Sequence, residues 1–294
     1  MTDIKATIEW YMTAGVEDFC TDMPLNVLKQ TVPAALSAQK KETRTEYSDA
    51  VQNTETQSES SEPPETSPYV YYQMADTNDD IRPATTPLAQ INTEACQNAR
   101  EICAKAQTLD DLRAMVENFE GCSLKFSANS TVFGYGNPQA EVMIVGEAPG
   151  ADEDRLGEPF VGRSGHLLDK MLASVGLNRN DDCYITNILL WRPPGNRTPT
   201  SEEVAVCLPF LQRQIELIKP KIIFILGRSA ANALLDNTDT ISDLRGHFID
   251  YVTESGLTIP TLSGFHPAYL LRTAAQKAKS WSDLLRLKRK LREL

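Results

Sequence analysis

Residues 143–165 of this chain read MIVGEAPGADEDRLGEPFVGRSG and contain the features that decide its fold. The apolar run 142–145 is typical of a buried strand, and it leads directly into a turn rich in glycine and carboxylates. A strand that ends in glycines commonly opens a ligand site, because a ligand can approach the backbone closely there. Since this loop is acidic, it repels phosphate and instead suits a neutral ligand together with a water molecule to be activated.

Three further apolar runs predict strands, and helical segments lie between and after the runs. The expected strands cover residues 142–145, 184–190, 222–226 and 257–262, and the expected helical segments cover residues 93–118, 164–176, 201–218, 228–235 and 279–292. Thr200 and Glu203 have the spacing of a capping box at the start of one helix. This alternation predicts an α/β fold with a parallel sheet covered on both faces. Glu147, Asn187 and His266 lie at or near strand ends, where such sheets bind ligands.

The N-terminal third differs in composition from the rest of the chain. Residues 1–30 carry apolar side chains at helical spacing and predict an N-terminal helical segment. Residues 31–92 are acidic, rich in Ser, Thr and Pro, and poor in large aliphatic residues. Such a segment cannot bury enough apolar area to offset its chain entropy, so we expect a disordered linker. The globular catalytic domain is expected over residues 93–294.

Charge and cysteine usage limit the environment of the protein. The chain has a net charge of −11, of which residues 1–110 contribute −10, so the N-terminal segment is a candidate docking region for a protein partner. Residues 268–294 carry a local charge of +6, which suits either a DNA backbone or a solvated helix face. Six cysteines without a C-x-x-C pair, no secretory signal and no membrane-spanning run together predict a cytoplasmic protein, which we expect to be a monomer.

The motifs resemble those of one enzyme family in both order and spacing. The matching segments are VFGYGNPQAEVMIVGEAPGADEDRLGEPFVGRSGHLLDKML (132–172), YITNILLWRPPGNRTPT (184–200) and GFHPAYLLR (264–272). The sequence from about residue 118 to 291 resembles the type 4 uracil-DNA glycosylases. This resemblance implies a three-layer sandwich with a short parallel sheet, usually four-stranded, between helices. It also implies an enzyme of base-excision repair that flips uracil out of DNA and hydrolyses its N-glycosidic bond, leaving an abasic site.

The residues in these motifs suit that chemistry. A pyrimidine ring can stack on Phe160, and the side-chain amide of Asn187 can pair with an adjacent donor and acceptor on the edge of uracil. His266 can donate a hydrogen bond to O2 as the uracil anion forms. Glu147, or a carboxylate of the 152–154 group, can orient or deprotonate the attacking water.

The resemblance adds three assignments that the residue types alone do not make. It assigns Ala148, like Glu147, to the first motif loop, at a position where glycine is frequent. It assigns Glu153 to the point where the C5 position of the base is tested and the methyl group of thymine is excluded. It assigns Asn196, in the PPGNR segment, to a further active-site position.

The mechanism also requires groups that hold bent or opened DNA. Tyr269, Leu270 and Leu271 directly follow the His266 motif and are candidate wedges, although one of the leucines can instead belong to the core. Arg272 is a candidate contact to a flanking phosphate. Further candidates for phosphate contacts are Arg163, Lys170, Arg192 and Arg197.

In its cysteines the chain departs from the family pattern. Family members commonly hold a four-iron, four-sulfur cluster on four cysteines. Two of the matching positions are Phe119 and Trp191 here, so only Cys122 and Cys207 remain. Because such a cluster needs four ligands, we expect no cluster, no metal and no other cofactor, with hydrophobic packing at the vacated positions.

Two other functions remain open. The first is a damage-sensing DNA-binding protein of the same fold without catalysis. The joint presence of Glu147, Phe160, Asn187 and His266 argues against it. The second is a glycosylase with a broader range of deaminated bases, which the loop sequences do not distinguish from a uracil-specific enzyme.

Overall fold

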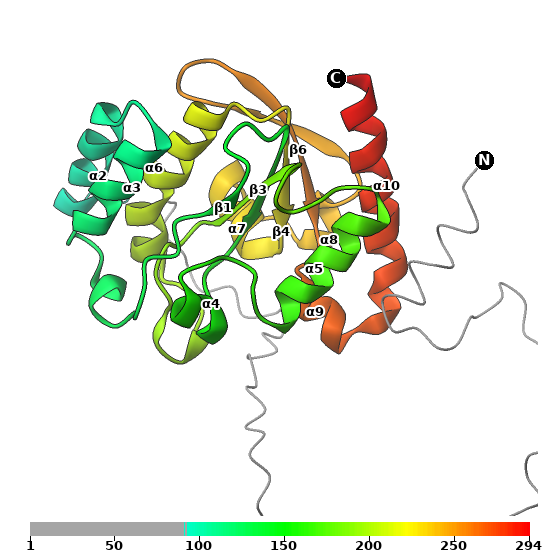
Figure 1. The fold of residues 1–294 in the computed structure, drawn as a ribbon, viewed down its shortest axis with the longest axis horizontal. Coiled ribbons are helices and arrows are strands. Elements are labelled where there is room, and N and C mark those ends of the chain that lie inside the picture. The colour runs from blue at the N-terminus through cyan, green and yellow to red at the C-terminus, as the bar shows by residue number, and fades with distance from the viewer. Residues whose placement is uncertain (1–90, 92) are drawn as a thin grey trace, which may run out of the picture. The chain divides into compact units, whose positions relative to one another are not determined.

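The computed structural model describes residue 91 and residues 93–294, and the centre of this part is a six-stranded β-sheet (Figure 1). The strands are β1 (Tyr135–Gly136), β2 (Val142–Gly146), β3 (Cys183–Asn187), β4 (Ile222–Leu226), β5 (Phe248–Val252) and β6 (Thr258–Gly264). Their order in the sheet is β1-β3-β2-β4-β6-β5. The inner four strands run parallel, and the edge strands β1 and β5 pair antiparallel with their neighbours.

The parallel strands end at a common edge of the sheet. Gly146 of β2 pairs with Asn187 of β3, and Leu226 of β4 pairs with Gly264 of β6. All residues of β2, β3 and β4 are buried, as expected for parallel strands covered on both faces. The loops that follow these strands therefore meet at one place.

Helices cover both faces of the sheet. The α-helices are α2 (Glu94–Lys105), α3 (Leu109–Asn118), α4 (Ala151–Leu156), α5 (Arg163–Ser174), α6 (Ser201–Ile218), α7 (Arg228–Leu235), α8 (Ile241–Leu244), α9 (Pro267–Arg272) and α10 (Lys277–Glu293). Short 3-10 helices cover Ser123–Phe126, Pro194–Asn196 and Ala274–Gln276. The expected capping box is present in α6, where the Thr200 hydroxyl accepts from the Glu203 backbone N–H at 3.2 Å and the Glu203 carboxylate accepts from the Thr200 backbone N–H at 2.9 Å.

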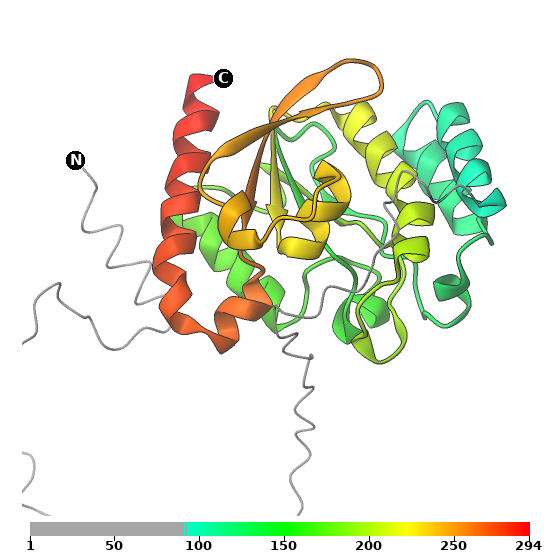
Figure 2. The ribbon, with the colours of Figure 1, turned by 180° about the vertical axis from the view of Figure 1, so that it is seen from behind.

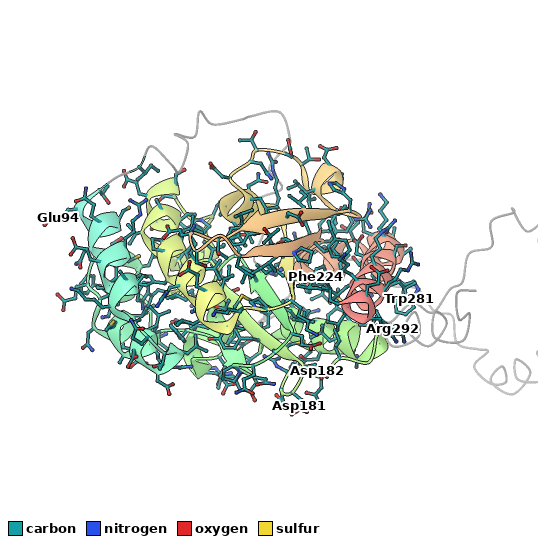
Figure 3. All side chains as sticks on the ribbon, turned by 90° about the horizontal axis from the view of Figure 1, so that it is seen from above. Glu94, Asp181, Asp182, Phe224, Trp281 and Arg292 are labelled. Carbon is teal, nitrogen blue, oxygen red and sulfur yellow. The ribbon has the colours of Figure 1, made fainter. Side chains whose placement is uncertain are left out.

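The sheet separates two hydrophobic cores. Because successive strand side chains point to opposite faces, β2 directs Met143 and Val145 to one core and Val142 and Ile144 to the other. The first core also contains residues of α2, α3, α6 and α7, and the second contains residues of α5, α9 and α10 (Figures 1 and 2). In the view of Figure 3, Glu94 of α2 and Arg292 of α10 lie on opposite sides of the sheet, and Phe224 of β4 lies between them.

The structure confirms the predicted fold class and adds detail to it. All four expected strands form the parallel core, but the sheet gains the edge strands β1 and β5, so the expected number of four is too low for the whole sheet. The strand expected at 184–190 ends at Asn187, and the helical segment expected at 93–118 is two helices. The N-terminal helical segment (1–30) and nearly all of the expected linker lie outside the described residues. Among the described residues, no helix has the length and apolarity needed to span a bilayer.

Candidate active site

The carboxyl edge of the parallel strands brings together four of the side chains that the sequence singles out. Asn187 is the last residue of β3, Glu147 directly follows β2, and His266 follows β6 as the N-cap of α9. Phe160 comes from the loop between α4 and α5. Residues from four separate segments thus converge at the place where an open α/β sheet binds its ligands.

Gly146 is the point where two of these side chains meet the backbone. A Cβ atom built on Gly146 would lie 2.3 Å from Asn187 Oδ1 and 2.7 Å from the Phe160 ring, so only glycine allows both to pack this closely. The Phe160 and His266 rings lie 5.5 Å apart between centroids, with an interplanar angle of 30°. On its other side His266 packs against the β4–α7 turn, where a Cβ on Gly227 would lie 3.3 Å from His266 Cβ.

The backbone of α9 determines the protonation pattern of His266. Its Nδ1 atom accepts a hydrogen bond from the Ala268 backbone N–H at 3.1 Å. A backbone N–H can only donate, so the proton of the neutral ring is on Nε2. Burial lowers the pKa of His266 to about 4, and the positive charge of Arg272 contributes to this lowering. At neutral pH the ring is therefore uncharged and offers an Nε2–H donor.

Glu147 is a half-buried carboxylate at the end of β2. Burial raises the pKa of Glu147 above its ordinary value, while a hydrogen bond with the Ser229 hydroxyl acts in the opposite direction. Ser229 lies in the first turn of α7, so the β4–α7 turn contacts both Glu147 and His266. The neighbouring Ala148 packs partly against the core next to α6 and contributes no polar side-chain atom to the site.

Glu153 is bonded to the backbone of the loops around it. One of its oxygens accepts from the backbone N–H groups of Val161 and Gly162 at 3.0 and 2.9 Å. The other accepts from the Gly150 N–H at 3.1 Å. Its carboxylate therefore holds the α4 loop to the loop that carries Phe160. The role in testing the C5 position of the base stays a prediction.

Asn196 is joined to α4 through an arginine. Arg192 Nε donates to Asn196 Oδ1 at 2.7 Å, and Arg192 Nη1 lies 3.9 Å from the buried carboxylate of Asp154. Asp154 also accepts from the backbone N–H groups of Asn129 and Ser130 at 2.8 and 3.2 Å. These contacts bring Asn196 to α4. Its catalytic assignment stays a prediction.

The expected DNA-contacting residues differ in exposure. Leu270 is fully buried in the core that contains α5 and α10, so the expectation that it acts as a wedge is wrong for this conformation. Tyr269 packs on Phe265 with ring centroids 5.2 Å apart, whereas Leu271 is 41% exposed and Arg272 is exposed. Helical periodicity explains this difference, because neighbouring residues of a helix cannot share one face.

The additional phosphate candidates divide in the same way. Two of them form ion pairs within the domain, because Arg192 lies near Asp154 and Arg197 is bonded to Glu203 at 2.9 Å. Arg163 and Lys170 lie exposed on α5, which begins directly after the Phe160 loop. For all four residues, contact with a phosphate backbone stays a prediction.

The residues at the family's cluster position do not fit an iron–sulfur cluster. Cys122 Sγ and Cys207 Sγ are buried and lie 4.0 Å apart. Phe119 occupies the neighbouring space, with its ring 6.5 Å from that of Trp191 and 5.1 Å from that of Phe210 between centroids. Within residues 91 and 93–294, no group of three or more His, Cys, Asp or Glu side chains is arranged to hold a metal ion. Two thiols beside three aromatic rings cannot supply the four ligands that a cluster needs.

Several residues with a part in the site were missed by sequence reasoning. Gly146, Gly227, Ser229 and Arg179 all touch the four convergent side chains or their backbone. Gly146 ends β2 and Gly227 directly follows β4, and a glycine at the end of an apolar run is a detectable signal. Ser229 and Arg179 carry no local signal, because their contacts join segments far apart in the sequence.

The stacking ring, the amide and the neutral imidazole define a site for a flat ring with polar edges, such as a nucleobase. Comparison with known proteins agrees with this description. Residues 133–285 match the model of the uracil DNA glycosylase superfamily. The chain belongs to that superfamily.

Similar proteins include three type-4 uracil-DNA glycosylases. The protein from Archaeoglobus fulgidus is 42% identical over 185 residues, which cover 62% of this chain and 92% of that protein. The protein from Thermotoga maritima is 39% identical over 176 residues, covering 60% and 89% of the two chains. The protein from Pyrobaculum aerophilum is 39% identical over 180 residues, covering 60% and 91%.

Proposed function

We propose that this chain is a monofunctional uracil-DNA glycosylase of base-excision repair. In this reaction the enzyme flips uracil out of DNA, hydrolyses the N-glycosidic bond and leaves an abasic site and free uracil. One observation carries the proposal: Asn187 and Phe160 meet at Gly146 on the carboxyl edge of the sheet, the His266 ring lies 5.5 Å from the Phe160 ring, and Glu147 directly follows Gly146.

The uracil base is held between one aromatic face and one amide. The Phe160 ring offers a stacking surface for the flipped pyrimidine. Asn187 presents a donor and an acceptor on one planar group, which matches an adjacent acceptor and donor on the edge of uracil. Because both side chains pack against the Gly146 backbone, they are preorganised and lose little entropy when the base binds.

His266 stabilises the leaving base. As the glycosidic bond breaks, negative charge develops on the uracil ring, and the Nε2–H of His266 donates a hydrogen bond to O2. The ring does this as a neutral donor, because its pKa is about 4 and its Nδ1 is engaged by the Ala268 N–H. Since the Nδ1 contact fixes the ring, the donor needs no reorganisation during the reaction.

Glu147 serves the other half of the reaction. The sugar gains oxocarbenium character as the base departs, and a carboxylate on that side favours the positive charge and orients or deprotonates the water. The half-buried position of Glu147 strengthens both effects, since electrostatic interactions are stronger where contact with water is reduced. The DNA strand would contact the α5 and α9 side, where Arg163, Leu271 and Arg272 are exposed.

The decisive experiment is cleavage of an oligonucleotide that contains one uracil. The purified full-length chain is incubated with this DNA, and alkali then breaks any abasic site. An oligonucleotide with thymine at the same position and the His266→Ala variant serve as controls. We expect cleavage at uracil only, and His266→Ala should reduce cleavage far more than DNA binding.

The other outcomes identify the alternatives. Binding of uracil-DNA without cleavage would favour a damage-sensing protein of the same fold. Cleavage of hypoxanthine-containing DNA at a comparable rate would favour a broader enzyme. Equal loss of cleavage and of binding in His266→Ala would contradict the role given to this residue.

A further inference from the structure

The backbone of Phe160 has a conformation that needs external support. Its φ angle of 54° lies in the left-handed region, which a bulky aromatic residue rarely adopts. Such a conformation persists only where the surroundings determine it. The Phe160 carbonyl also packs closely against α5. A Cβ atom built on Gly165 of that helix would lie 1.8 Å from the Phe160 carbonyl oxygen. The orientation of the ring therefore depends on the contacts that hold this loop.

Glu153 holds the loop from one side. Its carboxylate accepts from the N–H groups of Val161 and Gly162, the two residues that follow Phe160. The Val161 N–H shares a peptide plane with the Phe160 carbonyl, so Glu153 holds the plane that follows Phe160. The plane between Pro159 and Phe160 lies outside these bonds and needs a second contact.

Arg179 supplies this second contact from the opposite side. Its Nη1 atom donates to the Phe160 carbonyl and its Nη2 atom to the Pro159 carbonyl, both at 2.8 Å. The planar guanidinium matches two carbonyls in succession, a geometry that the single ammonium of lysine cannot reproduce. Arg179 thus holds the Pro159–Phe160 peptide plane, which Glu153 does not reach, and adds a second bond to the Phe160–Val161 plane.

Arg179 is itself fixed by two neighbours. Nη1 lies 3.0 Å from Asp169 Oδ1 of α5, and the guanidinium carbon lies 5.3 Å from the centre of the Tyr135 ring of β1. The Arg179 side chain is only 16% exposed, so these contacts are shielded from water. An edge strand, a helix and the loop before β3 therefore combine to orient one guanidinium on the Phe160 loop.

We propose that Arg179 is a positioning residue that sets the Phe160 ring for stacking on uracil. This inference rests on the proposed function, because it takes uracil as the base that stacks there. Arg179 does not touch the base and acts only through the Phe160 backbone. Loss of the Arg179 side chain should weaken the binding of free uracil and slow cleavage of uracil-DNA to a similar degree.

The experiment measures inhibition by free uracil in the full-length enzyme. Arg179→Met keeps the length of the side chain but removes both donors. We expect the inhibition constant for uracil to rise roughly fivefold, near the lower end of the loss caused by removing a stacking ring. Arg179→Lys should give a smaller rise, because lysine keeps the charge without the two-pronged geometry.

Arg213 provides a matched control for a loss of structure alone. It also binds a backbone carbonyl with two nitrogens, donating to Ala106 O at 3.1 and 2.6 Å, and it pairs with Glu216 at 2.9 Å. These contacts join α6 to the segment after α2 and do not reach the Phe160 loop. Arg213→Met should lower the melting temperature about as much as Arg179→Met but leave the uracil inhibition constant unchanged.

A double variant tests whether Arg179 acts through the ring. Phe160→Ala removes the stacking surface, so Arg179→Met should add no further loss of uracil inhibition in that background. Additive losses would overturn the inference, as would an unchanged inhibition constant in Arg179→Met. A wild-type chain that neither cleaves uracil-DNA nor responds to uracil would overturn the proposed function first. Normal wild-type cleavage with an unaffected Arg179→Met variant would overturn this inference alone.

Discussion

Gly146→Ala is the smallest change that should disable the proposed base pocket. The added methyl group would lie 2.3 Å from Asn187 Oδ1 and 2.7 Å from the Phe160 ring. The φ angle of Gly146 is not in the left-handed region, so alanine introduces no backbone strain. The substitution therefore acts only on the two side chains that are proposed to recognise the base.

The required displacement gives the size of the effect. Protein Cβ contacts essentially never fall below 3.0 Å, so Asn187 Oδ1 must retreat by about 0.7 Å and the ring by about 0.3 Å. A misplacement of about 1 Å in a catalytic arrangement can reduce the rate by about 10²-fold. We therefore expect kcat/KM for uracil-DNA to fall roughly 100-fold, which corresponds to about 2.7 kcal/mol of lost transition-state stabilisation.

The assay compares this variant with a second glycine that is equally crowded elsewhere. A Cβ on Gly121 would lie 2.4 Å from the Phe119 ring, in the corner that contains Cys122. Gly121→Ala should cost stability of the order expected for overpacking, about 1–3 kcal/mol, without changing uracil cleavage. Thermal unfolding and steady-state cleavage are measured on both variants and on the wild type.

Two results would refute this reasoning. Wild-type kcat/KM in Gly146→Ala would mean that Asn187 and Phe160 do not need to approach the end of β2. A similar loss of activity in both glycine variants would mean that lowered stability, rather than displaced base-recognising groups, accounts for the effect. Full unfolding of Gly146→Ala is not expected, because the crowding involves two side chains at the edge of a six-stranded sheet.

Four other predictions follow from the site and its surroundings. Because burial raises the pKa of Glu147, cleavage should decline as the pH is lowered through that pKa, and Glu147→Gln should remove this acidic limb from the rate profile. The purified protein should contain no stoichiometric iron and should melt at the same temperature with and without a chelator; a brown protein with about four irons per chain would contradict this. Leu270→Ala should lower the free energy of unfolding by about 2–5 kcal/mol, as for other buried leucines. Leu271→Ala should leave stability nearly unchanged and slow cleavage of duplex DNA more than of single-stranded DNA, and equal effects on both would argue against a wedge.

The parallel strands of the sheet could be predicted because burial on both faces requires continuous apolar runs in the sequence. Runs such as Ile222–Leu226 contain only apolar residues, and helical segments separate them. The edge strands have a weaker hydrophobic pattern in the sequence. Strand β1 has only two residues, and β5 has a single buried residue, Tyr251, among partly or fully exposed ones. Antiparallel pairing with a neighbour, not local hydrophobicity, defines these strands.

The break in the first helical segment has a similar origin. Apolar residues continue at helical spacing from α2 into α3, but the Thr108 side chain caps a new helix. The helices α4 and α9 have six residues each, too few for periodicity to be detected. Both are defined at their starts by a capping interaction, from Glu153 in α4 and from His266 in α9.

The residue types that form the candidate site could be predicted from the sequence. The contacts that hold these residues in place could not. Polar residues at strand ends are expected to converge, and Glu147, Asn187 and His266 do so. The contact between Arg179 and the Phe160 carbonyl joins residues 19 positions apart across a helix. Such a contact depends on how α5 lies against the sheet, and no local pattern encodes it.

The acidic loop shows why residue type alone could not identify the general base. The sequence offers four carboxylates, and three of them have structural partners. Asp154 is bonded to the backbone at Asn129 and Ser130, Glu153 accepts three backbone N–H groups, and Asp152 pairs with Arg155 at 3.3 Å on the surface. Glu147 differs, because it shares a hydrogen bond with the Ser229 hydroxyl and burial raises its pKa. A carboxylate whose pKa is raised by desolvation is better suited to accept a proton during the reaction. This contrast favours Glu147 as the group that activates water.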